Sequence, residues 1–267
     1  MAGAALTLST FFRAARTRRV WLLLAALALP FRVPSAAAAQ TVEELLHILR
    51  LEATPIGALP QIAMPMPASR NHNYWGIRLQ AGERRGRTGP DLRALAGGID
   101  LQYRGGSIFG ITGGYQSRDC ELAGEDCGGH TFFGARGRFN VISGGPTIGA
   151  VLGDYSATST LGTEIGFGYA PDVMPELDAC TFDIGVPLSL AMLQTVRLVS
   201  YVTPSIVWDV RCSDDGPPTR ASFLAAIGVG VQQIGARGLD VYLGLQKIFR
   251  SGTGYQFGLS VTYVRLP

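Results

Sequence analysis

Bulky apolar residues alternate with small or polar ones along two adjacent runs of the chain, 94–104 and 107–117. In the first run the odd-numbered face is Leu95, Gly97, Ile99, Leu101 and Tyr103, and the even-numbered face is Ala96, Gly98, Asp100 and Gln102. A repeat of two residues is the period of a β-strand. Between the runs, Arg104-Gly105-Gly106 fits a three-residue hairpin turn. We therefore predict an antiparallel hairpin in which Leu101 lies opposite Phe109.

The even-numbered face indicates the class of sheet. It consists mostly of glycine and alanine with an occasional charge, whereas a solvated sheet would carry Lys, Glu and Thr. Such a face suits a narrow, hydrated barrel interior, and the bulky face must then contact lipid. No segment after the leader reaches 18 consecutive apolar residues, which disfavours a helical membrane protein. The pattern predicts a membrane-embedded β-barrel.

Alternating runs recur along the rest of the chain. Eleven are found, at 73–81, 94–104, 107–117, 130–141, 146–153, 161–169, 181–190, 198–210, 221–233, 238–248 and 254–265. A single-chain bacterial barrel has an even number of strands, so at least one run is not a strand, and 146–153 alternates least. We predict an all-β, antiparallel up-and-down transmembrane barrel of about 10–12 strands over residues 72–267, preceded by a short N-terminal helix.

The first 39 residues resemble a secretory signal peptide. Five arginines and no acidic residue precede and flank the apolar segment Val20–Pro30, and Ala36–Ala39 supplies small residues for cleavage near Ala39. Removing these five positive charges from the net charge of +3 leaves −2 for the remaining chain. Thr17-Arg18-Arg19-Val20-Trp21 also resembles a twin-arginine signal, which would imply export of a folded protein.

Residues 40–71 are predicted to form a periplasmic helix and a proline-rich linker. Thr41 and Glu44 match a capping box, and an amphipathic helix is expected over about 42–51. The following stretch, 53–70, is interrupted by Pro55, Pro60, Pro65 and Pro67. This segment could plug the barrel, lie on the membrane, bind a periplasmic partner or serve as a flexible lead-in.

The four cysteines of an exported chain predict disulfide bonds. Three pairings are possible, and we favour Cys120–Cys127, within one loop, with Cys180–Cys212, at one end of a strand pair. A metal site is the alternative for 119–127, where carboxylates flank both thiols. No histidine completes a zinc-like set there, so the disulfide is preferred and no metal is expected.

Charged residues fall on the small-residue face of the predicted strands. The expected lumen network consists of Arg78, Asp100, Arg136, Arg138, Glu164 and Asp183, with Asp209 and Asp240 on the same face. Ions in a poorly hydrated lumen must pair, because an unpaired one costs several kcal/mol. The same lining could instead select solutes in a narrow channel.

The stretch from about residue 72 onward resembles the small outer-membrane β-barrel proteins of Gram-negative bacteria, the group that includes OmpX-like barrels. The signal peptide, the alternation and a last strand with Tyr255, Phe257 and Tyr263 carry this resemblance. It implies an outer-membrane location, contacts with membrane lipid and lipopolysaccharide, and insertion by the barrel-assembly machinery.

Motifs for chemistry are scarce. The chain has only His47, His72 and His130, and neither H-E-x-x-H nor G-x-S-x-G occurs. His130 with a nearby serine is the one enzyme candidate, and we expect no enzyme and no cofactor. The mature chain has no basic patch for nucleic acid.

Three functional classes remain: a structural or surface-interaction barrel, a narrow channel and, with least support, a lipid-modifying enzyme. Loop 82–93, with Arg84, Arg85 and Arg87, is expected to face outward toward lipopolysaccharide phosphates. We expect a side-chain-filled lumen, because barrels of about ten strands have interiors that side chains can nearly fill.

Overall fold

The computed structural model describes residues 42–61, 74–85, 91–103, 107–119, 128–144, 156–174, 177–193, 197–210, 212, 219–234, 238–250 and 253–265. Two helices come first, α2 (Val42–Ala53) and α3 (Pro55–Ala58). The strands follow as β1 (Tyr74–Arg85), β2 (Asp91–Tyr103), β3 (Ser107–Asp119), β4 (Gly129–Gly144), β5 (Ser156–Met174), β6 (Leu177–Gly185), β7 (Leu188–Leu193), β8 (Arg197–Val210), β9 (Arg220–Ile234), β10 (Leu239–Ile248) and β11 (Tyr255–Arg265).

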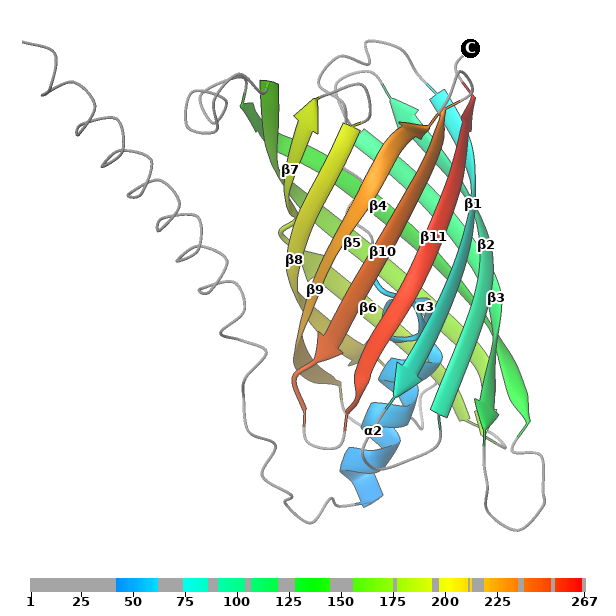
Figure 1. Cartoon of the computed structure of the whole chain (residues 1–267). Coiled ribbons are helices and arrows are strands. Elements are labelled where there is room, and N and C mark those ends of the chain that lie inside the picture. The colour runs from blue at the N-terminus through cyan, green and yellow to red at the C-terminus, as the bar shows by residue number, and fades with distance from the viewer. Residues whose placement is uncertain are drawn as a thin grey trace, which may run out of the picture. The chain divides into compact units, whose positions relative to one another are not determined.

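The strands form one closed antiparallel barrel (Figure 1). Apart from β6 and β7, strands adjacent in sequence pair with each other, and β1 pairs with β11 to close the ring. β6 and β7 share one position in the wall, because both pair with β5 on one side and β8 on the other. The eleven strands therefore make ten positions around the barrel, within the predicted range of about ten to twelve.

The break between β6 and β7 lies at Val186-Pro187, where proline cannot donate a backbone hydrogen bond. Backbone bonds from the flanking strands bridge the break. Val186 N–H donates to Pro204 at 2.9 Å, and Gly162 N–H donates to the Pro187 carbonyl at 2.9 Å. The wall therefore remains continuous across the proline.

The register of β2 and β3 confirms the predicted hairpin. Tyr103 lies opposite Ser107, and Leu101 lies opposite Phe109. Exposure also alternates as predicted: Leu95 is 66% exposed and Ile111 61%, whereas Ala96 is 3% and Asp100 2% exposed. Bulky apolar side chains thus cover the outside of the wall, and small or polar ones line the inside. This is the architecture of outer-membrane barrels.

Two predicted boundaries differ from the structure. The expected loop 82–93 is shorter, because β1 continues to Arg85 and β2 begins at Asp91. The polar end of β1 keeps its pairing with β2 and β11 beyond the last apolar residue, a continuation that hydrophobic alternation alone does not reveal. The weakest predicted run, 146–153, lies outside the described residues.

Helix α3 lies inside the barrel, and α2 projects from one mouth with its C-terminal part in the lumen (Figure 1). Glu43 and Glu44 in the first turn and Arg50 in the last suit the helix dipole of α2. Pro55 starts α3, where its missing N–H is harmless. The helix predicted at about 42–51 is found as α2, and of the locations that the sequence left open for this segment, the described residues 42–61, which we call the plug, extend from one mouth into the lumen. Residues 62–71 and the leader 1–39 lie outside the described residues.

The plug is exposed in the first turn of α2 and mostly buried from His47 to Gln61. Leu51 and Ile56 are 1% and 2% exposed, and they share an apolar cluster with wall residues Val207, Leu224 and Ile248. Among the described residues, no helix has the length and apolar character needed to cross a membrane.

A positive charge on the lipid-facing side should depend on depth in the wall. We expect Leu79→Arg, in the middle of β1, to lower the free energy of unfolding by about 2–4 kcal/mol, and Tyr103→Arg, at the end of β2, by about 0–1 kcal/mol. Urea titration of protein folded into phospholipid vesicles, followed by tryptophan fluorescence, measures both. Equal costs at the two positions would contradict an outward apolar band.

Candidate functional site: the plugged lumen

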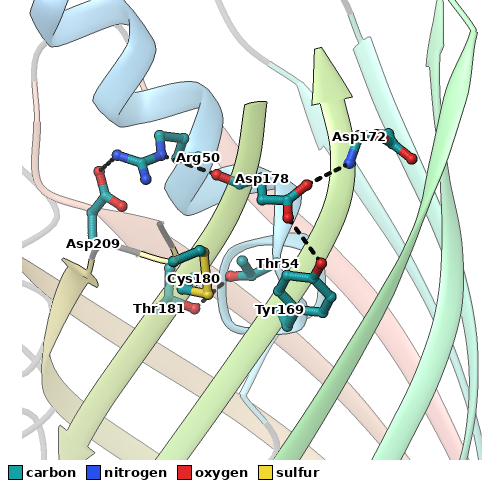
Figure 2. Close-up of a disulfide and its surroundings, with 9 residues drawn as sticks. Arg50, Thr54, Tyr169, Asp172, Asp178, Cys180, Thr181 and Asp209 are labelled. Carbon is teal, nitrogen blue, oxygen red and sulfur yellow. Dashed lines mark hydrogen bonds and ion pairs between the residues drawn. A yellow bond between two sulfur atoms is a disulfide. The ribbon is translucent and has the colours of Figure 1, made fainter. Parts of the chain in front are cut away.

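A cluster of buried polar side chains fastens α2 to β8 and β9. The carboxylate of Asp209 accepts from His47 Nδ1 at 3.0 Å and from Arg50 Nη1 at 3.1 Å. Arg50 Nε also donates to the Asp178 carbonyl at 3.4 Å (Figure 2). The side chains of His47, Arg50 and Asp209 are all at most 3% exposed. The Asp209 charge is thus shared by two plug residues.

The opposite ring nitrogen of His47 reaches a serine. His47 Nε2 lies 3.2 Å from Ser222 Oγ, and Arg250 Nε donates to the same oxygen at 2.5 Å. Partial burial lowers the pKa of Arg250, and the Glu44 carboxylate opposes that shift. Asp209, His47 and Ser222 have the connectivity of a Ser–His–Asp triad. Ser222 is nevertheless buried where α2 contacts the wall, and its hydroxyl oxygen accepts a hydrogen bond from Arg250. We therefore interpret the three residues as a structural contact, the lock on α2, that fixes the helix to the wall.

An ion pair between Glu52 and Arg84 fastens the other end of α2. Both side chains are at least nine-tenths buried. Arg84 therefore corrects the expectation that it faces outward: even-numbered residues of β1, such as Gln80, point into the lumen. Arg85 lies on the lipid-facing side of the wall, is 70% exposed and pairs with Glu83 at 3.1 Å. Arg87 lies outside the described residues.

Wall side chains bind the backbone of the plug. The last carbonyls of a helix have no partner within it. Gln116 Nε2 donates to the Glu52 carbonyl at 3.1 Å, and His130 Nε2 lies 3.0 Å from the Ala53 carbonyl. His130, the enzyme candidate of the sequence, thus caps the C-terminus of α2.

Beyond α2, a single wall glutamine binds the plug backbone at two points. Gln246 donates from Nε2 to the Ile56 carbonyl at 2.8 Å and accepts at Oε1 from the Gln61 N–H at 2.8 Å. The Gln61 side chain continues the contact, donating to Asp183 at 2.7 Å and accepting from Ser205 at 3.0 Å. The plug segment after α3 is therefore anchored to three different strands.

Two prolines of the plug pack against wall glycines. A Cβ added at Gly134 would lie 2.8 Å from Pro55 Cγ, and one at Gly258 would lie 2.5 Å from Pro60 Cγ. Gly168 and Gly244 continue these contacts on the neighbouring strands. No side chain fits at these positions while the plug is in place, so the glycines make room for it.

The predicted lumen charges are brought together in two groups. Arg78 pairs with Asp100 at 3.2 Å. Arg136 lies 3.1 Å from Glu164 and 3.8 Å from Asp183, which also accepts from the plug.

The remaining predicted charges of the lumen are also buried. Arg138 is 4% exposed and lies opposite Glu164 in the β4–β5 register. Asp240 is also buried, whereas Asp209 belongs to the lock on α2. Sequence analysis did not identify the plug partners His47, Arg50, Glu52 and Gln61. Polar residues on both faces of the predicted helix were the one signal that could have indicated a buried, polar environment.

A cavity of about 40 Å³ remains between α3 and the wall beside Arg78 and Arg136. This space holds on the order of three water molecules.

The predicted Cys180–Cys212 disulfide is present and joins the start of β6 to the chain after β8 (Figure 2). The next residue, Thr181, has its hydroxyl 2.7 Å from that of plug residue Thr54. The pairing of Cys120 with Cys127 lies outside the described residues. Among the residues described, no three His, Cys, Asp or Glu side chains are grouped to hold a metal.

Comparison with known proteins gives no family. No protein-family model and no curated protein matches the chain. Among solved structures, the chain is similar to the transport unit of the autotransporter AIDA-I from Escherichia coli, at 9% identity and a TM-score of 0.40 over 86% of this chain and 100% of that one.

Two further structures are similar at the same low level. LpxR from Salmonella typhimurium gives 8% identity and a TM-score of 0.41 over 71% of this chain and 99% of that one. Neisserial surface protein A gives 9% identity and a TM-score of 0.29 over 73% of this chain and 96% of that one. Likeness at this level assigns no activity. The strand pairing and outward apolar wall give this chain the fold of Gram-negative outer-membrane β-barrels, with no specific family.

The buried and exposed arginines of β1 offer a matched test. We expect Arg84→Gln to lower the free energy of unfolding by about 3–5 kcal/mol, because it leaves the Glu52 carboxylate buried without its charge partner. Arg85→Gln should cost less than about 1 kcal/mol, because its pair with Glu83 is exposed. Denaturant unfolding measures both, and a double variant with Glu52→Gln should cost less than the sum of the two single changes. Equal effects of the two arginines would contradict the inward placement of Arg84.

Glycines under the plug should tolerate a methyl group less well than lipid-facing ones. We expect Gly134→Ala to cost about 1–3 kcal/mol through overpacking against Pro55. Gly97→Ala is the control, because its added Cβ would lie 4.0 Å from the nearest heavy atom, Leu79 Cδ2. Unfolding of both variants in the same detergent, followed by fluorescence, provides the comparison. A neutral Gly134→Ala would show that the plug does not press on this wall.

Proposed function

We propose that this protein is a non-conducting outer-membrane β-barrel, closed by its own N-terminal segment, with a structural or surface-interaction role. One observation carries the proposal: the plug and the wall are complementary along the plug from α2 to Gln61. Glu52 of the plug forms an ion pair with Arg84 of the wall. Backbone groups of the plug hydrogen-bond to wall glutamines, and plug prolines pack against wall glycines.

The cost of separating these buried contacts supports a permanently closed lumen. Leaving one member of a buried ion pair without its partner is costly, so the plug cannot move away without rehydrating Arg84 and Asp209 together with their own partners. The residual cavity beside Arg78 and Arg136 is far smaller than a hydrated solute path.

The outer rim near the start of β2 supports a surface role. Arg85 and Arg93 are both exposed on the lipid-facing side there. Guanidinium groups form paired, charge-assisted hydrogen bonds with phosphate. We therefore propose membrane lipid and lipopolysaccharide as partners of this rim, and insertion into the outer membrane by the barrel-assembly machinery after removal of residues 1–39. Catalysis is not part of the proposal, because the Ser222 hydroxyl is buried at the junction of α2 and the wall.

A narrow channel is the second candidate. The Arg136 side chain is 26% exposed, although its partners Glu164 and Asp183 are at most 2% exposed. A cation beside a small cavity is the arrangement expected where a gated path could begin.

Single-channel recording in planar bilayers tests the closed lumen. We expect the wild-type protein to show no steady conductance. The double variant His47→Gln/Glu52→Gln, which weakens both anchors of α2, should show intermittent openings. The matched control Glu83→Gln, which alters an exposed ion pair, should remain silent.

Small, ion-selective currents from the wild type would favour the narrow channel. Steady, large and weakly selective currents would contradict the plugged lumen and indicate a porin.

A further inference from the structure

The two ends of the barrel wall lie at the same mouth. An even number of antiparallel positions returns the chain to the side where it began, and Trp75 at the start of β1 lies opposite Arg265 at the end of β11. We call this the terminal mouth. The other mouth is where β1 ends at Arg85 and β9 begins at Arg220, and we call it the far mouth.

The plug begins at the far mouth. Glu43, in the first turn of α2, pairs with Arg220, the first residue of β9. At the other end of α2, Glu52 pairs with Arg84, which lies one residue before the end of β1. Helix α2 therefore enters the lumen from the mouth opposite that at which the barrel wall begins (Figure 1).

The contacts then progress toward the terminal mouth. Gln61 bonds Asp183 and Ser205, which lie farther from the far mouth than Thr181 and Asp209 on the same strands, β6 and β8. Twelve residues separate Gln61 from Tyr74. Such a length spans up to about 40 Å, enough to complete a crossing from the middle of the wall.

We propose that the lumen is a polypeptide-binding site that holds residues 42–61 from the far mouth to the middle of the wall, so that the chain before Val42 emerges at the far mouth. The ligand is a segment of this chain, and part of its recognition is of backbone groups, by Gln116, His130 and Gln246. The first turn of α2 is thereby presented outside the far mouth, where Leu45 is 48% exposed.

Beside α3, the described part of the lumen has no room for a second polypeptide. The cavity of about 40 Å³ between α3 and the wall cannot admit another strand of polypeptide. We therefore expect the chain before Val42 and the chain after Arg265 to be on opposite faces of the membrane. The proposed structural role requires only a closed lumen, whereas this inference concerns the direction in which the chain passes through it.

Epitope accessibility on whole cells tests the inference with the full-length chain. One tag is inserted after Gln40 and another is appended after Pro267. Two reference tags are placed at 86–90, between the ends of β1 and β2 at the far mouth, and at 104–106, between the ends of β2 and β3 at the terminal mouth. Antibody binding is compared before and after permeabilisation of the outer membrane, and a heat-modifiable gel shift confirms that each tagged protein is folded.

We expect the Gln40 tag to share a membrane face with the 86–90 tag, and the Pro267 tag to share the other face with the 104–106 tag. Accessibility of the Gln40 and Pro267 tags on the same face would overturn the proposal. Bilayer recording distinguishes this failure from failure of the proposed function, because a silent protein with both ends on one face would still be a closed barrel.

A substitution avoids any effect of the inserted tag near the cleavage site. Leu45→Cys should react with a membrane-impermeant maleimide on the same face as the 86–90 tag, with the wild-type cysteines as background. Reaction on the face of the Pro267 tag would overturn the proposal equally.

Discussion

Polar groups that the barrel encloses are costly to leave without a partner, and the rest of the structure depends on this constraint. Because the outside of the wall contacts lipid, bulky apolar side chains are placed outward and polar ones inward. Ten wall positions enclose more space than inward glycines such as Gly134 and Gly258 can fill. The plug supplies both the missing volume and the missing hydrogen-bond partners. Wall and plug are therefore parts of one interior, and neither is satisfied without the other.

The wall was largely predictable because its signal is local. Alternation at period two needs only neighbouring residues, so Leu101 could be placed opposite Phe109 from the sequence. Discounting the run at 146–153 leaves ten runs, which correspond to the ten wall positions, with 181–190 covering both β6 and β7. The polar end of β1 was missed because Arg84 carries no apolar periodicity. Its inward direction follows from strand parity once the strand is known to continue.

The plug contacts were not predictable because they join distant parts of the chain. His47 and Asp209 are 162 residues apart, and Gln61 and Gln246 are 185 apart. Asp183 shows the difference between what a strand pattern predicts and what depends on the plug. Its place in a lumen network could be predicted from its strand, whereas its bond to Gln61 depends on how the plug enters. The capping residues and prolines predicted a helix and an irregular segment and left their location open.

The seam between β1 and β11 has a consequence for how the protein forms. It joins the first and last strands of the wall, so its pairing carries the largest loop-closure cost of any strand pair. The plug precedes β1 in the chain and lies inside the finished ring. Closing the seam therefore encircles a segment synthesised before any strand. Ring closure and plug docking then become one kinetic event, and a ring that closed without its plug would have to reopen this seam to become native.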